Sequence, residues 1–124
     1  MINKYFANLE DQIRLFDYLI HLYNVSIKNY SSTKGYIIGE IIFTDKSKLS
    51  FREVKDIELQ GKDKYAYNYI DGKNNLIFRY DNAPHYKQLD TFPHHKHLPD
   101  KIVESYEPEL IDIIFEIADY LKNK

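Results

Sequence analysis

The side chains best suited to chemistry gather in one segment, residues 78–97. It contains Arg79, Asp81 and four of the five histidines of the chain, which are His85, His94, His95 and His97. Histidine exchanges protons near neutral pH, and the planar guanidinium of arginine binds phosphate. Pro84 and Pro93 disfavour helix at and before their own positions, so we expect an ordered irregular segment that presents these groups to a ligand.

One chemistry that this set supports is the acid-base cleavage of RNA. Two histidines would carry protons between the 2′-hydroxyl and the leaving oxygen, namely His85 and one of His94, His95 and His97. Arg79 would stabilise the negative charge that develops on the phosphate. Asp81 or Glu53 would orient the histidines. This mechanism requires no cofactor, and it predicts a small endoribonuclease.

A second chemistry uses the same residues to bind a metal. On an extended backbone His95 and His97 lie on one side, and His85 and Asp81 would complete a Zn or Mn site across the loop. Because the chain has no cysteine, such a site would use only imidazole and carboxylate ligands. The sequence contains no HExxH pair or double carboxylate of a known hydrolytic centre, so acid-base catalysis is the main prediction and a metal-dependent nuclease is the alternative.

Two interpretations without catalysis also remain. The aromatic, arginine and histidine side chains could form a binding module that only holds a partner. Alternatively, Arg79 could pair with Asp81, Asn82 could form a turn, and the histidines could cap backbone groups.

The strands that position this segment are predicted from alternation along the chain. Residues 64–70 and 75–81 form the clearest hairpin, because Asp71-Gly72-Lys73-Asn74 tolerates the positive φ of a tight turn. Three tyrosines alternate on the first strand and share one face, namely Tyr65, Tyr67 and Tyr69. They would either pack as part of the sheet or form an aromatic floor beside the arginine.

The register of this hairpin decides which face the site occupies. If Ile70 pairs with Leu76, the tyrosines lie on the same face as Arg79 and Asp81. A change of one residue in the connection would reverse that relationship.

Earlier strands are predicted over residues 25–28, 36–43 and 49–54. In the last of these, Leu49, Phe51 and Glu53 share the apolar face. A carboxylate on that face either reaches solvent at a strand end or serves an inward-facing function.

Helical spacing is present at both ends of the chain. Apolar residues from Ile2 to Tyr23 follow the helical period, with His21 near the end of that helix as a packed or capping residue. A second helix is predicted to start at Ser105-Tyr106-Glu107-Pro108-Glu109 and to close the core. The fold class is therefore α+β, with an antiparallel meander sheet of about five strands flanked by an N-terminal and a C-terminal helix.

Length and composition indicate a single domain over residues 1–124. The chain is 44% hydrophobic and has a formal net charge of −2, which gives no global attraction to nucleic acid but permits a local basic patch. No run approaches the roughly 20 apolar residues of a membrane helix, and no signal peptide is recognisable. We expect a cytoplasmic protein without membrane association.

A family resemblance rests on two neighbouring motifs. They are Phe78-Arg79-Tyr80-Asp81-Asn82-Ala83-Pro84-His85 and Thr91-Phe92-Pro93-His94-His95-Lys96-His97. Together they closely resemble the signature of the TumE-like toxins of bacterial and archaeal type II toxin-antitoxin pairs. The resemblance implies a growth-inhibiting toxin that is neutralised by a cognate antitoxin, which in this family often carries a helix-turn-helix domain. The reaction, with RNA as the expected substrate, is inferred from the residues alone.

Overall fold

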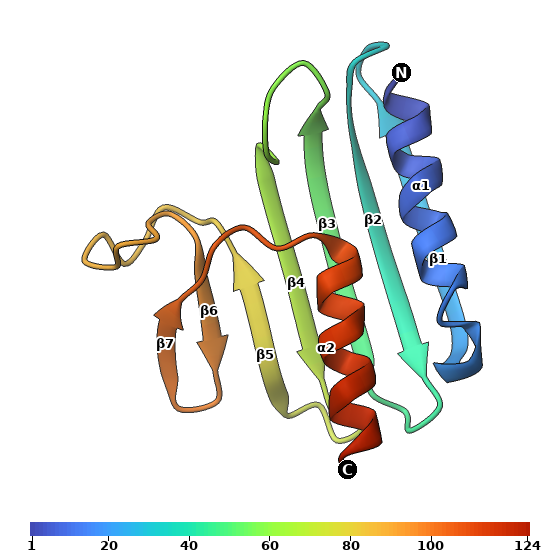
Figure 1. Ribbon diagram of the computed structural model, residues 1–124, viewed down its shortest axis with the longest axis vertical. Helices are drawn as coiled ribbons and strands as arrows, with labels where there is room; N and C mark the ends of the chain where they lie inside the picture. Colours follow the sequence, from blue (N-terminus) through green and yellow to red (C-terminus); the bar gives the residue numbers. More distant parts are fainter.

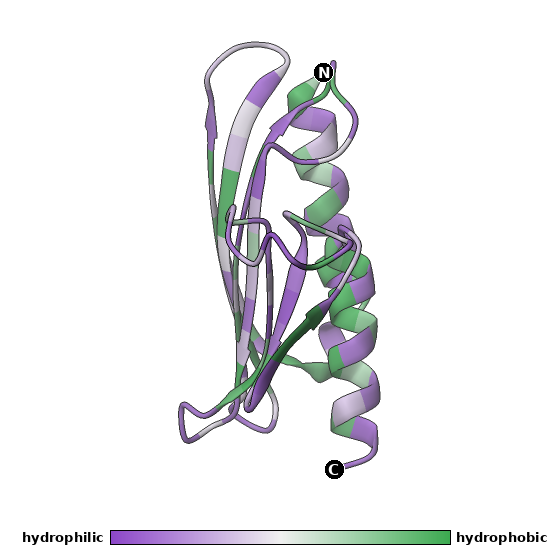
Figure 2. Ribbon diagram, turned by 90° about the vertical axis from the view of Figure 1, so that its left-hand side faces the viewer, coloured by the Kyte–Doolittle hydropathy of each residue, from purple (hydrophilic) through white to green (hydrophobic).

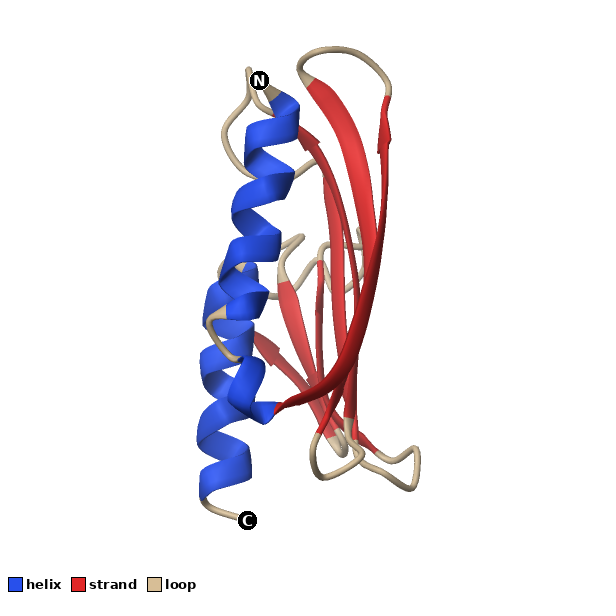
Figure 3. Cartoon of the chain, turned by 90° about the vertical axis from the view of Figure 1, so that its right-hand side faces the viewer, coloured by secondary structure: helices blue, strands red, loops and turns tan.

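The computed structural model describes residues 1–124. Its two helices, α1 (Ile2–Arg14) and α2 (Leu110–Lys122), cover one face of a single antiparallel sheet (Figures 1 and 3). Seven strands follow one another in meander order, namely β1 (Ile20–Asn29), β2 (Lys34–Phe43), β3 (Lys48–Asp56), β4 (Lys64–Ile70), β5 (Leu76–Asp81), β6 (His95–Leu98) and β7 (Lys101–Glu104). The α+β class and the two flanking helices are confirmed, whereas the expected strand number of about five was too low.

The additional strands β6 and β7 come from the segment that was expected to be irregular. Each has four residues, so neither is long enough for alternation to be recognised in the sequence. β6 pairs with β5, and Lys96 on the helix-covered face donates to the Glu116 carboxylate of α2 at 2.8 Å. Pairing and this contact hold β6 in place. The irregular part is confined to residues 82–94.

The N-terminal helix is shorter than predicted. α1 ends at Arg14, a short 3₁₀ helix (η1, Asp17–Leu19) follows, and residues up to Asn29 belong to β1. His21 is therefore an exposed strand residue and not a helix-end residue. The apolar residues after Arg14 fit both periods, and the long antiparallel pairing of β1 with β2 decides between them.

The C-terminal helix starts later than predicted, at Leu110. Glu109 is its N-cap, and a capping box joins Glu109 to Asp112, each side chain accepting a hydrogen bond from the backbone of the other. Ser105 thus does not cap the helix. Neither α1 nor α2 is long and apolar enough to cross a membrane.

The hydrophobic core lies between the helices and one face of the sheet. It is formed by alternate strand residues and by the inward stripes of α1 and α2, including Ile37, Ile41, Leu49, Tyr67, Tyr69, Phe78, Phe6, Ile13, Ile113 and Ile114. The opposite face of the sheet carries no helix, as the two edge-on views show (Figures 2 and 3). We call it the open face.

A register shift in the β4–β5 hairpin decides which residues reach the open face. Ile70 pairs with Leu76 as expected, but Tyr69 pairs with Phe78, so that β5 has one residue more than β4 at this point. Arg79 consequently pairs with Asn68 and turns away from the tyrosines. Of the two alternatives that the sequence left open, the structure has the second, with the tyrosines on the face opposite to Arg79 and Asp81. The tyrosines instead pack in the core.

Candidate functional site

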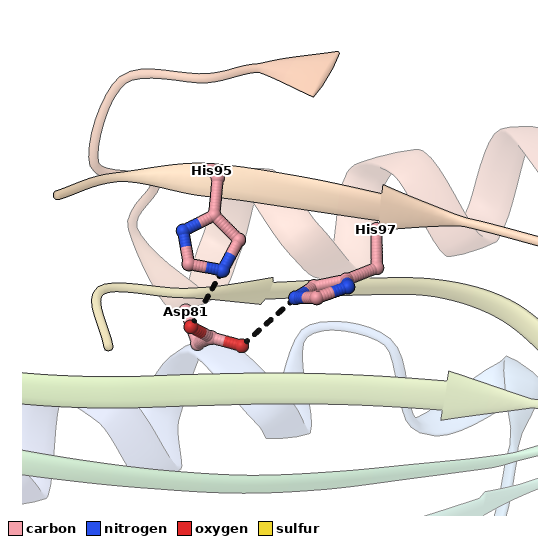
Figure 4. Close-up of side chains that lie close together, drawn as sticks. All are labelled: Asp81, His95 and His97. Carbon is pink, nitrogen blue, oxygen red and sulfur yellow. Dashed lines mark ion pairs between the residues drawn. The ribbon is translucent and has the colours of Figure 1, made fainter. Parts of the chain in front are cut away.

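Asp81, the last residue of β5, lies at the centre of the candidate site on the open face. Its Oδ1 accepts a hydrogen bond from the Ala83 amide at 3.0 Å and lies 2.9 Å from Nε2 of His95. Its Oδ2 lies 2.9 Å from Nε of Arg79. The same oxygen lies 3.4 Å from Nε2 of His97, and Figure 4 shows the contacts of Asp81 with both histidines. One buried carboxylate thus joins an arginine and two imidazoles.

The pairing of β5 with β6 creates this arrangement. Asp81 pairs with His95 and Arg79 pairs with His97, so the four residues occupy adjacent positions on two neighbouring strands. Because side chains alternate along a strand, all four point to the same face. The site is therefore built on regular structure, even though part of it was expected to be irregular.

The loop between the two strands covers the imidazoles from one side. Its Tyr86 adopts a left-handed backbone with φ of 60°. The Tyr86 ring packs edge-on against His95, with 5.0 Å between ring centroids, and against His97 at 5.9 Å. Sequence reasoning missed this residue, although an aromatic directly after His85 in a segment rich in histidine was a signal that could have indicated it.

His95 is buried, and both of its ring nitrogens face acceptors. Nδ1 lies 2.9 Å from the carbonyl oxygen of Pro93, which can only accept, so Nδ1 carries a proton. Nε2 faces the Asp81 carboxylate at 2.9 Å, so a second proton or a bound cation must lie between these two groups. With only 1% of its surface exposed, His95 holds Asp81 in place and cannot itself reach a large substrate.

Asp81 remains ionised despite its burial. Burial alone would raise the pKa of its carboxyl group, but hydrogen bonds from the Ala83 amide and the Arg79 guanidinium, together with the positive charges of His95 and Arg79, lower the pKa below its ordinary value. The site thus contains a fixed negative charge at neutral pH.

His97 is held in the neutral form. Burial lowers the pKa of its imidazole, the Asp81 carboxylate opposes that effect, and the positive charges of His95 and Arg79 lower the pKa further. Its Nε2 is directed at Asp81, and Nδ1 points away from that carboxylate (Figure 4). If Nε2 donates to Asp81, Nδ1 retains the lone pair of a proton acceptor.

Arg79 lies beside this proton acceptor and keeps donors available. Only its Nε binds Asp81, and the two terminal nitrogens of the guanidinium make no hydrogen bond within the protein. About a third of the side chain is exposed, at 35%. A fixed guanidinium with free donors beside a neutral imidazole is suited to an oxyanion or a phosphate.

Comparison with known proteins agrees with the motifs that surround this site. The model of the family described as Toxin TumE matches residues 9–123, which is nearly the whole chain. The chain belongs to the TumE toxin family. No curated protein and no solved structure gives a significant match. Membership makes the protein a toxin and implies a cognate antitoxin as its partner.

Three of the residues proposed from the sequence of this TumE-family toxin lie outside the cluster. Glu53 is fully buried on the helix-covered face, where its carboxylate accepts hydrogen bonds from the hydroxyls of Tyr5 and Tyr67. It therefore does not orient the histidines. His94 pairs its Nδ1 with the Tyr65 hydroxyl at 2.8 Å, away from Asp81.

The third residue outside the cluster, His85, lies exposed on the loop beside Tyr86. Its ring is 6.2 Å from the Tyr86 ring, between centroids, and Tyr86 separates it from His97. His85 is thus close to the site but not among the groups that contact Asp81.

The same cluster contains the donor atoms of a metal site. One ligand atom each from Asp81, His95 and His97 lies within 4.8 Å of the others. Nδ1 of His95 donates to the Pro93 carbonyl, so Nε2 is the nitrogen that could bind a metal. Metal-binding histidines commonly donate their other ring N–H to a carbonyl in this way. The donor set fits Zn or Mn. His85, which was expected as a further ligand, does not belong to this set.

Proposed function

We propose that this TumE-family toxin is an endoribonuclease that cleaves RNA by acid-base catalysis. The observation that carries the proposal is the contact between Asp81 and His97 beside the free donors of Arg79. It supplies an oriented proton acceptor and a phosphate-binding cation within one cluster that reaches solvent through Arg79 and His97, and this combination is what in-line attack of a 2′-hydroxyl requires.

In the proposed reaction Nδ1 of His97 takes the proton of the 2′-hydroxyl. The freed 2′-oxygen forms a bond to phosphorus while the bond from phosphorus to the 5′-oxygen breaks. Asp81 stabilises the imidazolium that forms on His97, and the guanidinium of Arg79 binds the charged phosphate. The products are a 2′,3′-cyclic phosphate and a 5′-hydroxyl.

The leaving 5′-oxygen needs a proton, and we assign its delivery to His85. This histidine is exposed on the loop that packs over His97 through Tyr86. An exposed imidazole on an irregular loop can approach a bound substrate without disturbing the sheet. His95 is assigned a positioning role, because it is buried behind Asp81.

The test is cleavage of a single-stranded RNA by the purified protein. We expect cleavage with 2′,3′-cyclic phosphate ends and loss of cleavage in His97→Ala and Arg79→Ala, with thermal melts showing that both variants remain folded at the assay temperature. A DNA strand of the same sequence should remain intact, because it has no 2′-hydroxyl. If the wild type leaves RNA intact while His97→Ala and Arg79→Ala remain as toxic as the wild type, the protein is a non-catalytic partner-binding module.

A metal-dependent nuclease is the second candidate function, and one observation favours it. A proton or a cation must lie between Nε2 of His95 and Oδ1 of Asp81, and His97 supplies a third donor atom next to them. A Zn or Mn ion held by Asp81, His95 and His97 would supply an activated water for hydrolysis. Arg79 would still bind the phosphate.

For the implied antitoxin we propose a helix-turn-helix protein encoded beside the toxin. The support is the resemblance of the two motifs in residues 78–97 to a family in which such antitoxins are common. Sequencing the neighbouring gene and co-purifying its product with the toxin tests this proposal.

A further inference from the structure

The open face contains a depression directly beside the candidate site. It has a volume of about 360 Å³, and its walls come from four successive strands, β2 to β5. The side chains that define it are Ile38, Ser50, Arg52, Ala66, Asn68 and Arg79. Arg79 therefore borders both the depression and the Asp81 cluster.

The register of the sheet explains why the face is hollowed at this point. Arg52 pairs with Ala66, and Ala66 pairs with Asp81, so the three residues form one row across β3, β4 and β5. With strands about 4.8 Å apart, the Cα atoms of Arg52 and Asp81 are separated by roughly 10 Å. Only the methyl group of Ala66 lies between them, which leaves space for part of a ligand.

The charges around the depression favour an anionic ligand. Arg52 is exposed and makes neither an ion pair nor a side-chain hydrogen bond within the protein. Glu40 also lines the depression, but Lys48 lies 3.9 Å from it and offsets its charge. Two arginines with free donors remain, Arg52 on β3 and Arg79 on β5.

Neutral groups on the floor add hydrogen bonding and apolar contact. Asn68 pairs with both Ser50 and Arg79 in the next row of the open face. Its amide therefore lies on β4 between the strands of the two arginines, and the Ser50 hydroxyl lies beside Arg52 on β3. Ile38 is 49% exposed at the far wall. A guanidinium beside an apolar side chain suits a nucleobase, and the amide suits its polar edge.

We propose that this depression binds the nucleotide next to the scissile phosphodiester, with the phosphate of that nucleotide on Arg52 and its base over Ile38, which pairs with Arg52 on the neighbouring strand. This subsite rests on the proposed ribonuclease function, because the scissile phosphate is assigned to Arg79 and His97. The RNA strand then crosses the sheet from β5 to β3 on the open face. Arg52 thereby sets affinity without taking part in proton transfer.

The test measures RNA binding and cleavage separately. Binding of a fluorescent single-stranded RNA oligonucleotide is measured in the non-cleaving His97→Ala background, with and without Arg52→Ala, over a range of salt concentrations. We expect Arg52→Ala to weaken binding about tenfold and to reduce the slope of log affinity against log salt by about 0.7, the value for one lost phosphate contact on a single strand. In the cleaving protein, Arg52→Ala should raise KM and leave kcat within about twofold.

Lys28→Ala is the matched control. Lys28 lies on the open face too, in the row that contains Lys64, but on the edge strand β1 and outside the depression. It should change neither the affinity nor the salt slope. Thermal melts of each variant exclude loss of fold, and Arg52→Lys should recover the salt slope but only part of the affinity.

The outcomes separate the subsite from the reaction. If the wild type leaves RNA intact but Arg52→Ala still reduces affinity and salt slope selectively, the subsite stands and the ribonuclease proposal fails. If the wild type cleaves RNA and Arg52→Ala has the same KM and RNA affinity, the subsite proposal is contradicted and the ribonuclease proposal is supported. Equal losses in Arg52→Ala and Lys28→Ala also contradict the subsite, because they indicate diffuse attraction to the whole face.

Discussion

Asp81 and His97 contact each other diagonally across β5 and β6, with 3.4 Å between Oδ2 and Nε2. The contact turns one imidazole nitrogen toward a carboxylate and leaves the other to face away from it (Figure 4). A carboxylate that fixes a histidine in this way selects its tautomer and stabilises its protonated form.

The pH dependence of cleavage should report the lowered pKa of His97. Only the neutral imidazole of His97 accepts a proton, so kcat/KM should fall as pH decreases through the pKa of His97. Because burial and the neighbouring cations lower the pKa from its ordinary value of 6.5, the acidic limb should lie below pH 6.5. A profile of kcat/KM between pH 4 and 8 checks this, and an acidic limb centred above pH 7 would contradict the assignment.

Replacing the central carboxylate should reduce both activity and stability. Asp81→Asn removes the charge that orients His97, and we expect kcat to fall roughly 100-fold or more. The same change should cost about 1–3 kcal/mol of unfolding free energy at neutral pH, since His95 and Arg79 lose their ionised partner. Steady-state kinetics and thermal melts measure the two effects.

The stability difference between wild type and Asp81→Asn should itself depend on pH. The folded-state pKa of Asp81 is lowered, so its stabilising contribution is complete above the ordinary aspartate pKa and is lost as pH falls through the folded value. The two proteins should therefore converge in Tm under acidic conditions. The control is Asp100→Asn at an exposed position between β6 and β7, which should match the wild type throughout.

Chelation distinguishes the acid-base enzyme from the metal-dependent one. We expect RNA cleavage to continue in excess chelator, with cyclic phosphate ends, because His97 and His85 need no metal. Complete loss that Zn or Mn restores would instead support the cluster as a metal site. In that case His95→Ala should abolish metal binding in calorimetry, while His85→Ala, outside the cluster, should retain it.

Glu53 should prove to be a stability residue. Glu53 is fully buried on β3 and accepts hydrogen bonds from Tyr5 on α1 and Tyr67 on β4. These hydrogen bonds stabilise the packing of α1 on the sheet. Glu53→Gln should lower the unfolding free energy by about 1–3 kcal/mol and leave kcat of the folded protein unchanged. Glu40→Gln, at an exposed carboxylate on β2, should leave the Tm unchanged. If Glu53→Gln lowered kcat without changing the Tm, Glu53 would have a role in catalysis and not in stability.

Growth inhibition in cells should respond differently to substitutions in the candidate site and in the hydrophobic core. Arg79→Ala and His85→Ala each remove a transition-state contact worth about 2–4 kcal/mol, a loss of tens to hundreds-fold in rate, and should abolish growth inhibition. His85→Ala should leave the melt unchanged, whereas Arg79→Ala should lower the Tm modestly, because it removes one hydrogen bond to Asp81. Ile114→Ala or Leu110→Ala opens a core cavity, costs about 2–5 kcal/mol and should lower the Tm while some activity persists at low temperature. Induced expression without the antitoxin, paired with melts, measures both. Full toxicity in both site variants would place the active site elsewhere.

The sequence alone determined which side chains are candidates for the site, and it placed Arg79 and Asp81 on a strand. Strand alternation is a local property, so the β4–β5 hairpin, the inward position of Glu53 and the shared side of His95 and His97 were all predictable. The two motifs in residues 78–97 likewise identified the family correctly.

The tertiary structure decided which of these groups act together. One extra residue in β5 relative to β4 turns Arg79 and Asp81 from the tyrosine side to the open face, and no local pattern encodes that choice. The pairing of β6 with β5 then selects His95 and His97 and leaves His94 to Tyr65. The register of two strands and the choice of neighbouring strand are non-local properties, because the free energy that decides them comes from contacts between segments distant in the chain. For that reason the sequence could name the candidate residues but not the cluster.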